Sequence, residues 1–385
     1  MCLKVLILSH THKKGEITIN TEIINTRVQN LRALMAEKGL DSFVLTVNER
    51  ANSESCYYIS GFRGSSAALI ISMNDSILIT DGRYQTQAKT QTPYKIVIQS
   101  ELSLPEYIAK AVSDSGYVRT GFEAEKISHA TFTKHFAPAK TQWLDASDLI
   151  PKLRRTKDAH EIALIRKAAQ IARDAYGQVL KHAHAGMTEV EFDSLLMSEI
   201  KKLGAEKGWA HDDFIVASGQ RSAMCHAPAT MKAFAQGENV TVDYGAMYQG
   251  YMSDITRNFS LGRPDSKALE INSILLKAHK AAAESLRPGI SGCEVDATAR
   301  KVISDSGYGE YFVHGLGHGL GLEVHESPRL SKTSKDILQI GDVVTVEPGI
   351  YIEGWGGLRI EDDYLITEDG AECLTVNDNQ SIEII

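Results

Sequence analysis

Apolar and polar positions divide the chain into two parts with different patterns. In the first part, apolar residues recur at helical spacing from Thr26 until Gly39, as expected for an amphipathic helix. Short β-rich runs follow and alternate with turns and helical stretches up to about Leu149. This alternation predicts a smaller α/β domain over residues 25–150. The clearest predicted strands are Ser42–Val47, Ala67–Ile71 and Ser76–Thr80.

The second part begins after Pro151, which precedes a basic run and marks a predicted domain boundary. Long helices come first, and one of them opens with a capping-box pattern formed by Thr188 and Glu191. Short strands then dominate, so we expect an α+β domain with an antiparallel sheet over residues 151–385. Residues 1–24 form an extension of unknown role. The predicted helices of the second part span residues 158–180, 188–203, 266–287 and 293–306.

Composition and charge exclude several classes of protein. The 385 residues are 43% hydrophobic with a formal net charge of −8, which supports a real core and argues against disorder. No long basic cluster occurs, so we expect no nucleic-acid partner. No apolar run reaches the roughly 18 residues of a membrane span, so we expect no membrane partner. The five scattered cysteines form no Cys-x-x-Cys pair, which favours a cytoplasmic location.

A β-rich run that ends in a carboxylate occurs twice in the second part. Gly237-Glu-Asn-Val-Thr-Val-Asp-Tyr-Gly245 returns as Gly341-Asp-Val-Val-Thr-Val-Glu-Pro-Gly349. A second carboxylate follows each copy, Asp254 after the first and Glu361 after the second. The repeat predicts two similar half-sites that face one another across an internal pseudo-two-fold axis.

Hairpins are expected to bring the two acids of each half-site together. In the first copy, residues 247–250 are predicted to form the turn and residues 251–254 the return strand, which places Asp243 near Asp254. The second copy joins its two acids in the same way across a glycine-rich turn. A pair of acids at this spacing is a weak signal alone, because surface acids are common.

A glycine-rich segment with three histidines adds a different kind of group. It reads His314-Gly-Leu-Gly-His318-Gly-Leu-Gly-Leu-Glu-Val-His325-Glu. The spacing of His314 and His318 suggests a zinc-binding helix, but each glycine weakens a helix by about 1 kcal/mol relative to alanine. A phosphate-binding loop fails the G-x-G-x-x-G spacing, because residue 320 is leucine. A strand and tight turn with the backbone close to a ligand fits better.

Four concentrated acids need a positive charge among them, because otherwise they repel and some become protonated. Four carboxylates and one imidazole match divalent ions such as manganese, cobalt or zinc. The physical fit is to a pair of ions roughly 3.5–4 Å apart. A hydroxide between them would be nucleophilic near neutral pH.

The chain resembles the pita-bread metallopeptidases, in particular the Xaa-Pro branch that holds aminopeptidase P and prolidase. Its N-terminal part is similar to the creatinase-type domain of that branch, in Tyr58–Phe62 and Thr80–Tyr84. The likeness extends from about residue 26 to the C-terminus. The matching C-terminal segments are residues 218–227, 242–246, 250–257, 314–326, 346–351 and 359–362.

The resemblance implies a metal-binding role for each of five residues. Asp243 would chelate one metal, and Asp254 and Glu361 would bridge both. His318 and Glu347 would bind the second metal, with Glu347 also exchanging a proton with the bridging water. Manganese is the expected metal, with cobalt or zinc as alternatives.

The resemblance also implies four catalytic residues that are not ligands. His226, His314 and His325 would orient the substrate, stabilise the oxyanion and pass a proton to the proline nitrogen. Arg359 would bind a peptide carboxylate or hold a carboxylate ligand in place. Without the resemblance, His226 is more simply a buried histidine, and Arg257 is more simply a structural ion-pair partner. Cys225 departs from the family, which usually has proline there.

These features together predict a dinuclear-metal Xaa-Pro peptidase that acts on proline-containing peptides. We favour an aminopeptidase P-like enzyme, with Xaa-Pro dipeptidase (prolidase) as the alternative. A creatinase-like hydrolase and a non-catalytic peptide-binding module are weaker alternatives, since all five ligand types are present. Methionine aminopeptidase shares the fold but is disfavoured by the N-terminal domain. The family resemblance implies a homodimer or a dimer of dimers.

Overall fold

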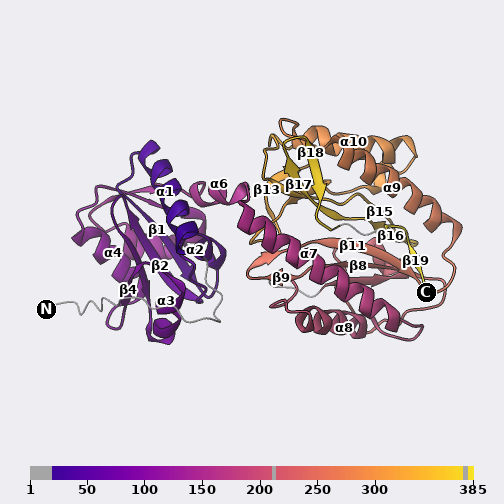
Figure 1. The fold of residues 1–385 in the computed structure, drawn as a ribbon, viewed down its shortest axis with the longest axis horizontal. Helices are drawn as coiled ribbons and strands as arrows, with labels where there is room; N and C mark the ends of the chain where they lie inside the picture. Colours follow the sequence, from indigo (N-terminus) through magenta and orange to yellow (C-terminus); the bar gives the residue numbers. More distant parts are fainter. Residues whose placement is uncertain (1–19, 210–213, 376–379) are drawn as a thin grey trace. The chain divides into compact units, whose positions relative to one another are not determined.

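The computed structural model describes residues 20–209, 214–375 and 380–385, and the chain divides into two compact units, with the boundary in the sequence between Arg154 and Arg155 (Figure 1). Most of the predicted extension of residues 1–24 lies outside the described residues. Its last residues belong instead to helix α1, which begins at Thr21 rather than at the predicted Thr26. The helix begins early because the side chain of Asn20 accepts a hydrogen bond from the Glu22 amide, 2.9 Å away.

The N-terminal unit is built on a six-stranded mixed sheet with helices, as the α/β prediction expects (Figure 1). The strand order is β4-β3-β2-β1-β5-β6, in which β1 pairs antiparallel with β2 and parallel with β5. The strands are β1 (Ser42–Asn48), β2 (Ser66–Ser72), β3 (Ser76–Thr80), β4 (Lys95–Ile98), β5 (Arg119–Phe122) and β6 (Gln142–Asp145). The helices are α1 (Thr21–Glu37), α2 (Ser53–Ser60), α3 (Gln85–Gln91), α4 (Leu104–Asp114), α5 (His129–Thr131) and α6 (Leu149–Arg155), the last of which crosses the boundary.

The C-terminal unit contains two helix pairs, each with its own hydrophobic core (Figure 1). The apolar faces of α7 and α8 pack on the first half of the strands, and those of α9 and α10 pack on the second half. Thr188 caps α8 and forms a capping box with Glu191, as predicted. The helices are α7 (Ala159–Val179), α8 (Glu189–Lys202), α9 (Ser266–Ser285) and α10 (Gly292–Asp305).

The strands of the C-terminal unit repeat one arrangement twice, which agrees with the predicted internal pseudo-two-fold. A long strand leads into a small hairpin, and a second long strand then returns antiparallel to the first. The first set is β8 (Asn239–Tyr244), β9 (Met247–Tyr248), β10 (Tyr251–Met252) and β11 (Ile255–Ser260). The second set is β14 (Val343–Val346), β15 (Gly349–Ile352), β16 (Gly356–Arg359) and β17 (Asp362–Thr367). The remaining strands are β7 (Ile215–Ser218), β12 (Gly317–Gly319), β13 (Glu326–Leu330), β18 (Gly370–Cys373) and β19 (Glu383–Ile384).

The predicted return strand of residues 251–254 is wrong in detail. Tyr251 and Met252 pair only with the short β9, and the strand that returns along β8 is β11, where Thr256 lies opposite Asp243. Asp254 therefore sits at the junction between the hairpin and the return strand. Glu361 occupies the matching junction between β16 and β17.

Within the described part of the chain, no helix has the length and apolar character needed to span a membrane.

Candidate metal centre

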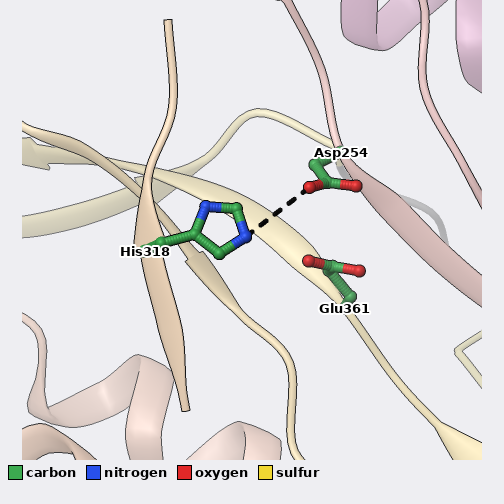
Figure 2. A group of neighbouring side chains, drawn as sticks. All are labelled: Asp254, His318 and Glu361. Atoms are coloured by element: carbon green, nitrogen blue, oxygen red, sulfur yellow. Dashed lines mark ion pairs between the residues drawn. The ribbon is translucent and has the colours of Figure 1, made fainter. Parts of the chain in front are cut away.

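Three side chains from three separate segments point at a common space in the C-terminal unit (Figure 2). Asp254, His318 and Glu361 each offer one ligand atom, and these atoms lie within 4.8 Å of one another. His318 Nε2 is 3.8 Å from Asp254 Oδ2. All three side chains are buried, although two are acids, so the group has the composition of a metal site.

The other two predicted ligands join the same group. His318 Nε2 lies 3.4 Å from Glu347 Oε1. Asp243 is buried, and Arg359 links it to Glu361, with its Nη2 2.6 Å from Asp243 Oδ2 and its Nε 4.0 Å from Glu361 Oε2. The structure thus gathers all five predicted ligands, with two acids from each repeated strand set.

Two glycines on either side of His318 allow the backbone of its strand to pack closely against the backbone of neighbouring segments. A Cβ atom on Gly317 would lie 2.0 Å from the carbonyl oxygen of Thr345, and one on Gly319 would lie 2.3 Å from that of Ser327. Neither position tolerates a side chain, so β12 approaches β13 and β14 more closely than other sequences would allow. The expected strand is confirmed at Gly317–Gly319, in place of a zinc-binding helix.

The imidazole of His318 is arranged as a metal ligand would be. Its Nδ1 lies 3.1 Å from the carbonyl oxygen of Gly319, which can only accept, so Nδ1 carries the proton and Nε2 keeps its lone pair. Burial and the neighbouring His325 lower the pKa of His318 to about 3. The ring is therefore neutral, and Nε2 is directed at the acids.

The acids repel one another in their ionised forms, and a bound cation would relieve that repulsion. Burial, with the charges of Glu361 and Asp243, raises the pKa of Asp254 well above its usual range. Burial also raises the pKa of Glu347 to about 8 and that of Glu361 well above normal. Among the described residues, Asp243 Oδ1 and Asp254 Oδ1 are buried without any hydrogen-bond partner. Buried carboxylate oxygens without partners fit missing metal bonds, so the donor set suits divalent ions.

Arg359 is buried and its donors point inward. Its Nη2 lies 2.6 Å from Asp243 Oδ2, and its Nε donates to the hydroxyl of Thr256 at 2.9 Å. Its Nη1 donates to the Tyr351 hydroxyl at 2.8 Å and to the Cys225 carbonyl at 3.2 Å. Of the two roles expected for Arg359, this geometry fits the holding of a carboxylate ligand rather than the binding of a peptide carboxylate.

Tyr351 connects this arginine to His314. The tyrosine hydroxyl lies 2.9 Å from His314 Nε2, while His314 Nδ1 lies 2.7 Å from the carbonyl of Gly315. Because that carbonyl can only accept, Nδ1 is protonated and Nε2 accepts the tyrosine proton. Burial and the charge of Arg359 lower the pKa of His314 to about 4, so this ring is neutral. A continuous chain of hydrogen bonds therefore runs from Asp243 to His314.

The three predicted non-ligand histidines border the group of acids. His314 is half-buried, and its Nδ1 lies 3.9 Å from Glu347 Oε2. His325 is exposed, and its ring meets that of His318 at a centroid distance of 4.3 Å. His226 is exposed, and a positive charge on it acts to lower the pKa of Asp243, His314 and His325.

The loop that bears His226 is fastened by a buried acid at the start of α8. Glu189 accepts hydrogen bonds from the amide and hydroxyl of Ser218 and from the amide and hydroxyl of Thr230, at 2.7–3.0 Å. It also pairs with Arg221, 3.0 Å away. Both ends of the loop are thus tied to one carboxylate.

Sequence reasoning missed Tyr351, Thr256 and Glu189. Tyr351 and Thr256 lie inside segments that carry the family resemblance, so their membership of a motif was a usable signal. Thr256 donates to Glu361 Oε2 at 2.6 Å and thereby joins the two strand sets. Nothing in the local pattern marks Glu189 as more than a first-turn acid. Arg257 pairs with Asp362 at 2.6 Å in the interior, which fits the structural role expected for it.

Comparison with known proteins assigns the chain to a family. Residues 163–368 match the model of Metallopeptidase family M24, and residues 27–156 match that of the Creatinase/Prolidase N-terminal domain. The chain therefore belongs to the M24 family of metallopeptidases. The predicted pita-bread fold with a creatinase-like N-terminal domain is confirmed, and so is the prediction of a hydrolase.

Individual relatives match over nearly the whole chain. The Xaa-Pro dipeptidase of Pyrococcus horikoshii is 36% identical over 94% of this chain and 100% of its own length. A solved structure of the Xaa-Pro dipeptidase from Bacillus anthracis has a TM-score of 0.88 and 38% identity, and the match covers 94% of this chain and 100% of that one. The X-Pro aminopeptidase from Thermotoga maritima has a TM-score of 0.84 and 38% identity, with 90% and 98% covered.

Proposed function

We propose that the protein is a metal-dependent Xaa-Pro peptidase whose main substrates are Xaa-Pro dipeptides. The observation that carries the peptidase assignment is the convergence of four carboxylates and one imidazole, with two carboxylate oxygens buried and unpartnered among the described residues. Two of the three relatives described above are named dipeptidases and one an aminopeptidase. These names support the Xaa-Pro class and agree better with prolidase than with the aminopeptidase P-like enzyme favoured from the sequence.

Five residues would hold the metals, and their donor set fits divalent ions. Asp243, Asp254, His318, Glu347 and Glu361 supply carboxylate oxygens and one imidazole nitrogen, which suits manganese first and cobalt or zinc as alternatives. When bound, two such ions supply Lewis-acid activation of water and of the scissile carbonyl. The protein's own part is to hold the substrate and move protons around that centre.

Proton transfer falls to Glu347 and the bordering histidines. Glu347 accepts the proton of the attacking water, and the protonated Nδ1 of His314 lies 3.9 Å from Glu347 Oε2, where it stabilises the ionised carboxylate that takes up this proton. The Xaa-Pro bond is a tertiary amide without an N–H group, and its nitrogen needs a proton before it leaves. His226 and His325 lie at the exposed border of the site, where they meet the peptide and its oxyanion.

Arg329 is the residue that favours dipeptides. It lies on β13 directly across from His318, so its side chain starts on the same face of the sheet. Its charge lowers the pKa of His318, His325 and Glu347, and its guanidinium makes no hydrogen bond or ion pair with the described residues. An exposed, unpaired arginine beside the site suits the free carboxylate that directly follows proline in a dipeptide.

Chelation and metal restoration test the proposal. The purified protein is stripped, manganese is restored, and Xaa-Pro dipeptides are assayed beside Xaa-Pro-Yaa tripeptides. Metal-dependent cleavage of dipeptides supports the proposal, and preferential cleavage of tripeptides would establish the aminopeptidase P alternative. Absence of metal-dependent cleavage of either would reject the Xaa-Pro function.

A substrate without the carboxylate tests Arg329 separately. Wild-type protein should prefer Xaa-Pro over Xaa-Pro amide by about 10- to 100-fold, the range expected for a charge-assisted hydrogen bond. Arg329→Met should remove that preference while metal content stays unchanged. If Arg329→Met kept the same preference as the wild type, another group would be the one that binds the carboxylate.

We also propose a cytoplasmic homodimer. The described cysteines Cys56, Cys225, Cys293 and Cys373 are free, which supports a reducing compartment. Size-exclusion chromatography with light scattering tests the oligomeric state, and a monomer would reject the dimer.

A further inference from the structure

An acid and an arginine on α10 form a forked ion pair, in which every nitrogen of the guanidinium and both carboxylate oxygens take part in hydrogen bonds. Arg300 Nε lies 2.8 Å from Asp296 Oδ2, and Arg300 Nη2 lies 2.9 Å from Asp296 Oδ1. The two residues are one helical turn apart, and their side chains are 14% and 1% exposed. They lie outside the group of metal ligands and belong to none of the predicted site segments.

The pair reaches the backbone on both sides of His314. Arg300 Nη1 donates to the carbonyl of Phe312 at 2.9 Å, and Nη2 donates to the carbonyl of His314 itself at 2.8 Å. Asp296 Oδ1 accepts a hydrogen bond from the Leu316 amide at 3.1 Å. Hydrogen bonds to the backbone of Phe312, His314 and Leu316 thus fix the path of the chain on both sides of the histidine.

The same arginine also supports the histidine ring through Phe312. The guanidinium lies over the Phe312 ring, 4.0 Å from its centroid. The Phe312 ring in turn meets the His314 ring edge-on, with centroids 5.1 Å apart and an interplanar angle of 87°. Backbone and ring of His314 are therefore both positioned from α10.

General stabilisation does not account for this arrangement. A buried ion pair seldom stabilises a fold relative to apolar residues of similar size. The next pair along the same helix, Lys301 and Asp305, has the same spacing and lies 2.6 Å apart, but its side chains are 74% and 63% exposed. The exposed Lys301–Asp305 pair therefore serves as a control for the general effect of removing an i,i+4 ion pair from this helix.

We propose that Asp296 and Arg300 are positioning residues that hold the imidazole of His314 against Tyr351 and Glu347. The proposal rests on the proposed function, in which His314 assists proton transfer. A ring held by its own backbone and by an aromatic edge keeps its geometry while charge develops beside it, which is the condition for efficient catalysis.

Kinetics of Arg300→Met test the consequence for the reaction. We expect kcat on an Xaa-Pro dipeptide to fall by about 10- to 100-fold, the range for residues that orient a catalytic group. KM should change little, because the pair does not touch substrate. Arg300→Lys keeps the charge but loses the fork, so it should fall in between. Lys301→Met should match the wild type.

A double-mutant comparison separates positioning from general damage. If Arg300 acts through His314, then Arg300→Met should have no further effect on kcat in a His314→Ala background. A destabilised fold would lower activity by the same factor in both backgrounds. Additive losses would overturn the proposal.

A readout that needs no activity keeps the two proposals distinguishable. The zinc-loaded protein with ¹⁵N-labelled histidine should show a hydrogen-bonded Nδ1–H signal for His314, identified by its loss in His314→Ala. Arg300→Met should shift or broaden that signal, and Lys301→Met should leave it unchanged. An unchanged signal in Arg300→Met would overturn the positioning role. A changed signal in a protein whose wild type hydrolyses no peptide would uphold positioning and reject the proposed function.

Discussion

At alkaline pH, the metal-free Glu347→Gln protein should have a higher free energy of unfolding than the metal-free wild type. Burial raises the pKa of Glu347 from 4.5 to about 8, so the folded state keeps a proton that the unfolded chain releases. Between these two pH values the unfolded state binds fewer protons, and the free energy of unfolding falls as pH rises. Above pH 8 the carboxylate is ionised in both states, and its full cost is present.

The size of the effect follows from the shift in pKa. One pKa unit corresponds to about 1.4 kcal/mol, so a shift from 4.5 to about 8 corresponds to at most roughly 5 kcal/mol. Glutamine has the shape of the protonated acid and cannot ionise. Glu347→Gln should therefore match the wild type near pH 4.5 and exceed it by a few kcal/mol at pH 8.5.

Urea unfolding in the presence of chelator measures this difference. The comparison uses the transition that responds to added metal, since a chain of two compact units can unfold in more than one transition. Glu353→Gln, which changes an exposed acid, serves as the matched control. Equal midpoints for wild type and Glu347→Gln at pH 8.5 would refute the reasoning. Added manganese should reverse the order, because only the wild type has the carboxylate that metal requires.

Three further substitutions, one of them with a matched control, probe the site and its supports. Asp254→Asn should abolish dipeptide cleavage while the circular dichroism spectrum stays unchanged. Undiminished turnover in this variant would contradict the proposed two-metal site. Gly317→Ala should cost about 1–3 kcal/mol in urea unfolding and weaken metal binding, because its Cβ would lie 2.0 Å from a carbonyl oxygen. Gly177→Ala, in open space on α7, should instead stabilise by up to about 1 kcal/mol, and equal losses at the two glycines would contradict this. Glu189→Ala should cost about 3–5 kcal/mol, because it leaves Arg221 unpaired, and a loss below about 1 kcal/mol would show that the loop does not depend on Glu189.

The elements that the sequence predicted well are those set by local rules. Strand β3 has the predicted bounds, Ser76–Thr80, because its apolar run is short and flanked by turns. Helix α8 begins after Thr188 because its capping box satisfies the first backbone amides. The grouping of the four acids in one site could be predicted because the strand that ends in an acid occurs twice in the sequence.

The details that failed depend on partners far away in the chain. The interruption of the hairpin before Asp254 follows from strand pairing, since β11 rather than residues 251–254 returns along β8. The roles of Tyr351 and Arg300 depend on contacts with His314, and no spacing rule indicates which distant group a side chain will meet. Our proposal of prolidase likewise rests on Arg329, whose position opposite His318 comes from cross-strand register.

The duplicated arrangement has a consequence for how the protein is made. Asp243 and Asp254 lie in the first strand set, Glu347 and Glu361 lie in the second, and the two sets meet where the Glu361 amide donates to the Thr256 carbonyl. A chain emerging from the ribosome completes the first set long before Glu361 has been synthesised. Half a site offers too few ligands to bind a metal pair, so a nascent or truncated chain should have no hydrolytic activity. Peptidase activity therefore appears only once synthesis and folding of this unit are complete.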